Sequence, residues 1–132
     1  MIDDLLNRVA QIAPHLPGGV NDPRSFEKLQ AERGEFAETI AERDGLGAFT
    51  ELADILYYVG KCLLNDLLGR PEAEQIIQEA LASLDASGDG VDAGTALAIL
   101  DAKYRVRVEG RKNDTEERQR VQDALTAVGR WG

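Results

Sequence analysis

The chain has 132 residues, a length typical of one domain around a single hydrophobic core. Its 24 acidic residues outnumber its 15 lysines and arginines, so the formal net charge is −9. This charge argues against a surface for nucleic acid or for an anionic membrane, because both need basic patches. The sequence therefore predicts one acidic domain over residues 1–132.

Neither end of the chain nor its cysteine content indicates export. The sequence begins Met1-Ile2-Asp3-Asp4, without the basic region of a signal peptide, and no apolar run reaches the roughly 18 residues of a membrane span. Cys62 is the only cysteine, which excludes an intramolecular disulfide, and its apolar neighbours favour a buried thiol. We expect a cytoplasmic protein.

Apolar residues recur at helical spacing along most of the chain. Helices are predicted over residues 2–13, 22–43, 48–68, 70–84 and 95–108, and a sixth follows a capping run at residues 113–117. Asp22 is expected to cap the second helix, with Pro23 in its first turn. No segment shows the strict alternation of a strand. The sequence predicts an all-α bundle of about five to six helices.

The third predicted helix is apolar around most of its circumference, so it belongs in a core. Its few polar residues form one narrow stripe made of Glu51, Asp54, Tyr58, Lys61 and Asn65. So much apolar surface exceeds what one thin core hides, which favours a homo-oligomer. Trp131 is expected to pack against the bundle or a second subunit.

Two acidic pairs lie on consecutive predicted helices. Glu32 and Glu35 are three residues apart, as are Glu51 and Asp54, so each pair shares one helical face. If residues 44–47 turn the chain back, the two helices run antiparallel and the four carboxylates converge. Such crowding needs a cation, and Mg²⁺ or Mn²⁺ prefers oxygen ligands. The alternative is a solvated face with ordinary ion pairs.

A loop near residue 85 begins like a calcium-binding EF-hand. Residues 85–90 read Asp-Ala-Ser-Gly-Asp-Gly, with oxygen ligands at alternate positions. The twelfth position is Ala96, where an EF-hand needs a bidentate glutamate, and the eighth is Asp92 in place of an apolar residue. The sequence predicts a plain loop between two helices.

A basic cluster follows the acidic pairs late in the chain: Lys103, Arg105, Arg107, Arg111 and Lys112. Lys103 and Arg107 are four residues apart and share one helical face. Cations of this kind could bind phosphate groups. They could equally be charges at a helix end, favoured there by the helix dipole.

The acidic pairs and their apolar neighbours, residues 29–40 and 51–58, resemble the MazG-like all-α nucleoside triphosphate pyrophosphohydrolases. The signature of that family is Glu-x-x-Glu, a linker and Glu-x-x-Asp, and the linker here is the 15 residues from Phe36 to Thr50. Residues 101–107 are similar to the later helix in which the family places a lysine and an arginine near the phosphates. Asp101 stands where the family often has an asparagine. The N-terminal helix and the tail after Gly110 have no counterpart.

The resemblance implies cleavage of a nucleoside triphosphate between the α- and β-phosphates, with Mg²⁺ held by Glu32, Glu35, Glu51 and Asp54. Members of the family are dimers or tetramers. The other residues expected at the site fall into two groups. Glu38, which continues the three-residue spacing, and Lys103 are the expected catalytic residues, and Lys103, Arg107, Asp101 and Tyr58 are expected to bind substrate.

Two functions follow from these patterns. The first is a Mg²⁺-dependent enzyme that hydrolyses a (deoxy)nucleoside triphosphate in nucleotide-pool housecleaning. The second is a noncatalytic module that has the same helical fold and binds a nucleotide or a protein. The complete acidic quartet together with Lys103 favours the enzyme. Aromatic residues for a base slot are Phe26, Tyr57, Tyr58 and Tyr104, although these positions also suit the core.

Overall fold

A computed structural model describes residues 1–130 as a bundle of α-helices. The elements are α1 (Ile2–Ile12), the 3-10 helix η1 (Ala13–His15), α2 (Ser25–Ala41), α3 (Gly45–Leu64), α4 (Arg70–Ala86), α5 (Ala93–Val108) and α6 (Asp114–Ala127). No strand occurs among the described residues. The predicted all-α bundle of five to six helices is confirmed. The prediction for Trp131 lies outside the described residues.

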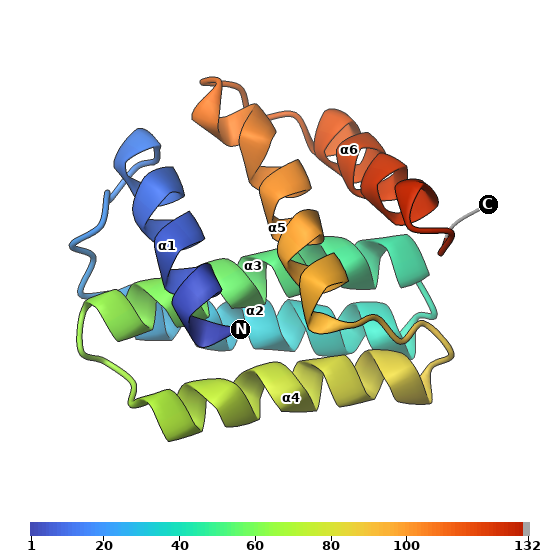
Figure 1. The fold of residues 1–132 in the computed structure, drawn as a ribbon, viewed down its shortest axis with the longest axis horizontal. Helices are drawn as coiled ribbons and strands as arrows, with labels where there is room; N and C mark the ends of the chain where they lie inside the picture. Colours follow the sequence, from blue (N-terminus) through green and yellow to red (C-terminus); the bar gives the residue numbers. More distant parts are fainter. Residues whose placement is uncertain (131–132) are drawn as a thin grey trace.

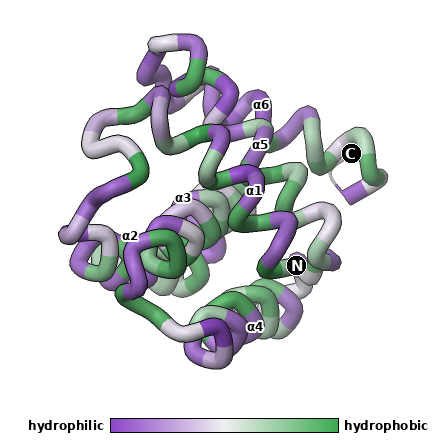
Figure 2. The backbone as a smooth tube through the Cα atoms, turned by 60° about the vertical axis from the view of Figure 1, so that its left-hand side comes forward, coloured by the Kyte–Doolittle hydropathy of each residue, from purple (hydrophilic) through white to green (hydrophobic). Residues whose placement is uncertain are grey.

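Helix α3 is the centre of the bundle. Figure 1 shows α2, α3 and α4 along the long axis of the molecule, with α1 and α5 laid across them. Helix α3 contacts α1, α2, α4, α5 and α6. In Figure 2 hydrophobic and hydrophilic residues alternate around the turns of α1 and α2, as expected for helices that pack one face on a common core.

Helix α3 lies in the core, as predicted. The homo-oligomer that was expected from its apolar surface does not follow from this placement. Leu52, Ile55, Leu56 and Val59 are buried by helices of the same chain, as is Cys62. The apolar surface of α3 therefore does not require a second subunit, because five neighbouring helices already cover it. None of the helices in the described part of the chain has the length and apolar character needed to cross a bilayer.

The connection between α2 and α3 is shorter than predicted. The turn was expected at residues 44–47, but Gly45 already begins α3 and Arg43 reverses the chain with a φ of 57°. Asp44 caps the new helix, since its carboxylate accepts a hydrogen bond of 2.9 Å from the Gly47 amide. Helices α2 and α3 therefore lie side by side and run in opposite directions (Figure 1).

Helix α2 begins at Ser25, later than predicted, but Asp22 still serves its start, since the Oδ1 atom accepts a hydrogen bond of 3.0 Å from the Arg24 amide. The Oδ2 atom binds the Lys61 ammonium at 3.1 Å and the Lys28 ammonium at 2.7 Å. Lys61 is only 1% exposed, so its charge needs a buried counterion. Asp22 therefore ties the 16–24 loop to α3 as well as to the start of α2.

Helices α1 and α3 approach each other closely at Gly60. A Cβ atom on this residue would lie 2.5 Å from Cγ2 of Val9 and 2.9 Å from its Cβ. Both residues are buried, so neither side can move into solvent. Gly34, in the exposed part of α2, would meet nothing within 4 Å.

The substitutions Gly60→Ala and Gly34→Ala are therefore expected to change stability in opposite directions. Overpacking at Gly60 should lower the free energy of unfolding by about 1–3 kcal/mol. Gly34→Ala should raise it by about 0.5–1 kcal/mol through helix propensity. Urea unfolding followed by circular dichroism measures both. Equal stabilities for the two variants would contradict the close approach of α1 and α3.

Candidate metal site

Three of the four predicted carboxylates form one cluster. Glu32 and Glu35 of α2 and Glu51 of α3 each offer one oxygen, and these oxygens all lie within 4.8 Å of one another. The residues are brought together because α2 and α3 pack side by side and each carries its acids on the facing side. Within residues 1–130 no other group of acidic, histidine and cysteine side chains is arranged in this way.

The cluster is partly withdrawn from water. The Oε2 atoms of Glu32 and Glu51 are buried and have no hydrogen-bond partner within the described residues. Burial, together with the neighbouring carboxylate of Asp54, raises the pKa of Glu32 to about 10. Burial likewise raises the pKa of Glu51 to about 7. These carboxylates therefore resist ionisation until a cation offsets their mutual repulsion.

Asp54, the fourth predicted ligand, lies beside the cluster but already has partners. Its Oδ2 atom accepts a hydrogen bond of 2.5 Å from the Lys103 ammonium, and its Oδ1 atom accepts one of 2.7 Å from the Tyr104 hydroxyl. The residue is buried, with an exposed fraction of 6%. As a metal ligand, Asp54 would have to exchange one of these hydrogen bonds or use a remaining lone pair.

The acidic cluster opens into a pocket of about 410 Å³ between α2, α3, α5 and α6. In addition to the four carboxylates, its lining residues are Thr50, Lys103, Arg107, Lys112, Asp114, Glu117 and Arg118. Lys103 and Arg107 both face this pocket from α5, as their spacing predicted. The pocket therefore places two cations opposite the acidic cluster, an arrangement that suits an anion bound through a metal.

Glu117 was missed by the sequence analysis. It is 1% exposed, and its Oε1 atom lies 3.2 Å from the Arg107 guanidinium and 4.0 Å from the Lys103 ammonium. Its Oε2 atom is buried without a partner in the described part of the chain. In the sequence it is one of several acids in the first turn of a polar helix, so no local pattern separates it from its neighbours.

Three of the predicted site residues, Glu38, Asp101 and Tyr58, lie outside the pocket. Glu38 is exposed and one turn further along α2, where it does not line the cavity. Asp101 points toward α1, since its carboxylate accepts a hydrogen bond of 2.8 Å from Arg8. Asp101 is two positions from Lys103 and therefore points to another side of α5. Glu38 is three positions from Glu35, but it lies one turn beyond the cavity. Tyr58 lines a neighbouring pocket.

We expect Glu38→Gln to leave any metal-dependent activity within about threefold of the wild type, the usual range for exposed charges away from the chemistry. Metal affinity, measured by titration with Mn²⁺, should be unchanged as well. A loss of activity beyond about 100-fold, typical of a removed general base, would restore the catalytic prediction for Glu38.

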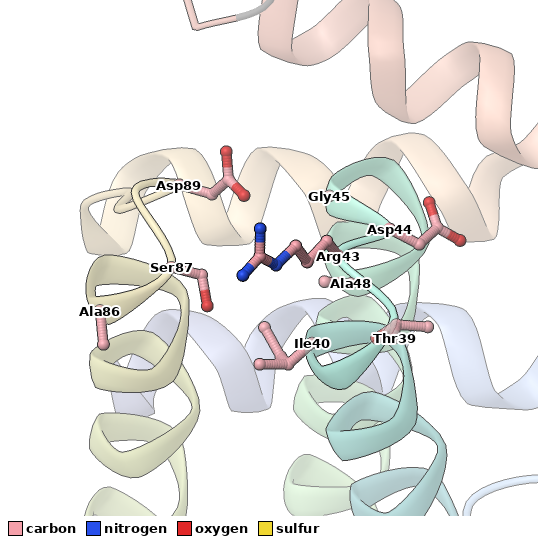
Figure 3. A pocket seen from close by; sticks show the side chains of 9 residues that line it. All are labelled: Thr39, Ile40, Arg43, Asp44, Gly45, Ala48, Ala86, Ser87 and Asp89. Atoms are coloured by element: carbon pink, nitrogen blue, oxygen red, sulfur yellow. The ribbon is translucent and has the colours of Figure 1, made fainter.

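A further pocket of about 460 Å³ lies at the other side of the α2–α3 turn. Figure 3 shows Arg43 reaching from that turn toward Ser87 and Asp89 at the end of α4. Ser87 and Asp89 belong to the segment that begins like an EF-hand. Its first two residues, Asp85 and Ala86, still belong to α4, and residues 87–92 form a plain loop between α4 and α5. The lining combines one arginine with two aspartates, Asp44 and Asp89, so it presents no uniform charge to a ligand.

Comparison with protein-family models, with curated proteins and with solved structures finds no match. The chemistry of the site therefore rests on its own residues. Mg²⁺ and Mn²⁺ prefer carboxylate oxygens, and the buried oxygens of Glu32 and Glu51 lack any other partner among the described residues. The donor set therefore fits a hard divalent cation.

Proposed function

We propose that this protein is a Mg²⁺-dependent enzyme that hydrolyses a (deoxy)nucleoside triphosphate to the monophosphate and pyrophosphate, with Mn²⁺ as an alternative metal. The observation that carries the proposal is the cluster of three glutamates facing Lys103 and Arg107 in one pocket. Its resemblance to the MazG-like pattern gives the reaction. A role in cytoplasmic nucleotide-pool housecleaning follows from the same resemblance.

Glu32, Glu35 and Glu51 would hold the metal, with Asp54 at their side. Bound there, Mg²⁺ would offset the charge of the phosphates and lower the pKa of a coordinated water. Both pairs project from packed helices, so the carboxylates are positioned before the metal arrives. Positioning of this kind reduces the reorganisation needed during reaction.

Lys103 and Arg107 would bind the phosphates opposite the acidic cluster. Lys103 is 6% exposed and contacts the carboxylates of Asp54 and Glu117, so its ammonium is held in place. Arg107 is held by Glu117 at 3.2 Å, while its buried Nε atom has no partner within residues 1–130. That donor remains for a phosphate oxygen. Glu117 thus acts as a positioning residue for both cations.

The pairing of Asp54 favours a second candidate, a noncatalytic module that binds a nucleotide or a protein on the same shell. A carboxylate already engaged by Lys103 and Tyr104 contributes less to metal binding than a free one. Such a module would bind metal and nucleotide without hydrolysis. Product analysis separates the two candidates.

The test is release of pyrophosphate and of the matching monophosphate from canonical and modified nucleoside triphosphates, with Mg²⁺, with Mn²⁺ and with chelator. We expect equal amounts of the two products, only in the presence of metal. Inorganic phosphate in place of pyrophosphate would exclude the proposed bond cleavage. Binding without any product would favour the noncatalytic module.

We also propose that the chain forms a homodimer or homotetramer. The resemblance supports this assembly, and Phe26, Leu67 and Val128 are large apolar residues that stay exposed in the single chain. Light scattering during size-exclusion chromatography should give two or four times the 14.4 kDa of one chain. A mass of 14.4 kDa across micromolar concentrations would exclude the assembly.

A further inference from the structure

A second pocket, of about 420 Å³, adjoins the acidic one. Arg107 and Lys112 line both, so the two cavities meet at these cations. Three tyrosines, Tyr57, Tyr58 and Tyr104, line the second pocket. Its other side chains include His15 of the 3-10 helix and the cations Lys28, Lys61, Arg107, Arg111 and Lys112. A flat ring system with one anionic end would have its ring among the tyrosines and its anionic end at the junction.

Tyr57 is the feature of this pocket that points to a ligand. Its side chain is 2% exposed, yet its hydroxyl is buried without a hydrogen-bond partner within residues 1–130. The ring cannot swing to solvent, because it stacks on Tyr104 with centroids 4.5 Å apart and meets Tyr58 edge-on at 5.1 Å. A buried hydroxyl without a partner is costly, so this group is poised to bond something in the cavity.

Two polar groups beside Tyr57 have internal partners. The Tyr104 hydroxyl donates to Asp54, and the Lys61 ammonium, 5.5 Å from the centre of the Tyr57 ring, binds Asp22. Neither group is bonded to the Tyr57 hydroxyl. The buried Nε atom of Arg107, which also lines this pocket, likewise has no partner within residues 1–130.

We propose that this pocket holds the base of the nucleotide whose phosphates lie in the acidic pocket, and that the Tyr57 hydroxyl reads the polar edge of that base. The proposal rests on the proposed function for the position of the phosphates. The partly exposed Tyr58 lies next to Tyr57 at the same wall and offers a face for stacking. Arg107, at the junction, then lies near the sugar and the α-phosphate, between the base and the other phosphates.

A single hydroxyl of this kind discriminates between bases. A tyrosine hydroxyl both donates and accepts one hydrogen bond, so a base that presents a matching group in reach binds better than one that does not. A site built around a buried polar group rejects ligands that leave it unbonded. Tyr57 is thus a specificity-determining residue, and the preferred base is the one that completes its hydrogen bond.

The variant Tyr57→Phe tests this because it should move stability and binding in opposite directions. Removing an unbonded hydroxyl should raise the melting temperature of the free protein by roughly 2–5 °C for a chain of this size. Affinity for the preferred nucleoside monophosphate should fall about tenfold or more, the usual worth of one hydrogen bond in a dry site. The affinities of the variant for the five nucleoside monophosphates should therefore become similar to one another.

Tyr104→Phe is the matched variant for the stability measurement, because the hydroxyl that it removes is bonded to Asp54. It should lower the melting temperature, so the two substitutions differ in sign. Binding is measured by calorimetry with the monophosphates of adenosine, guanosine, cytidine, uridine and thymidine, which require no hydrolysis. A ranking of these ligands that is identical in wild type and Tyr57→Phe, or no binding of any of them, overturns the proposal.

These titrations separate the base pocket from the reaction. Pyrophosphate release by the wild type tests the proposed function, whereas the monophosphate ranking tests Tyr57. Hydrolysis with an unchanged ranking would reject only the role of Tyr57. Selective monophosphate binding that depends on Tyr57, without hydrolysis, would keep the pocket and reject the enzyme.

Discussion

Replacing Glu51 by Gln is expected to abolish metal-dependent pyrophosphate release and to weaken Mn²⁺ binding. The amide keeps the shape of the side chain but removes the charge and one oxygen ligand from the three-glutamate cluster. We expect a loss of at least about 100-fold in activity, the upper end of what loss of a group supporting a metal ligand costs. Pyrophosphate release and Mn²⁺ titration by electron paramagnetic resonance measure the two effects.

The same substitution should make the metal-free protein more stable. The charge of Glu51 is partly buried and is repelled by Asp54 and Glu35, so its removal relieves both costs. Glu42→Gln is the matched control, since Glu42 is exposed at the end of α2 and lies outside the pocket. A Glu51→Gln protein that binds Mn²⁺ as the wild type does would contradict the metal site.

The fold could be predicted from the sequence because the apolar periodicity is strong and the helix ends carry their own caps. Asn113 illustrates this, since its side chain accepts the Glu116 amide at 3.1 Å and α6 begins where the capping run predicted. Asp22 shows the limit of local patterns. Its carboxylate accepts the Arg24 amide near the start of α2, but it also binds the buried ammonium of Lys61, which lies 39 residues away along the chain. Long-range electrostatic requirements of this kind leave no local pattern.

The acidic cluster was predictable for a related reason. The three-residue spacing of each pair places its acids on one face, and the short turn at Arg43 holds the two faces together. The sequence could not show that Asp54 is engaged by Lys103, because that contact depends on how α5 packs across α3. The same packing turns Asp101 away to Arg8 and brings Glu117 into the pocket. Pairwise helix orientation, rather than periodicity, decides these positions.

The metal-free protein is expected to lose stability as the pH rises from about 5 to about 8. The pKa of Glu51 is raised from 4.5 to about 7, so over this range the folded state keeps a proton that the unfolded state has released. Stability falls wherever the folded state binds more protons than the unfolded state. The pKa of Glu32, raised to about 10, extends the loss to higher pH. Melting temperatures recorded with chelator across this range measure the effect.

Mg²⁺ should reverse this loss, because the metal takes the place of the retained protons. At pH 8 a concentration of one hundred times the dissociation constant should stabilise the protein by about 2.7 kcal/mol. At pH 5 the protons compete, so the same concentration should have little effect. A melting temperature that is constant between pH 5 and 8 with chelator would contradict the buried acidic cluster. If the pH dependence is present but Mg²⁺ and Mn²⁺ do not reverse it, the cluster is buried as described and its oxygens do not bind a divalent cation.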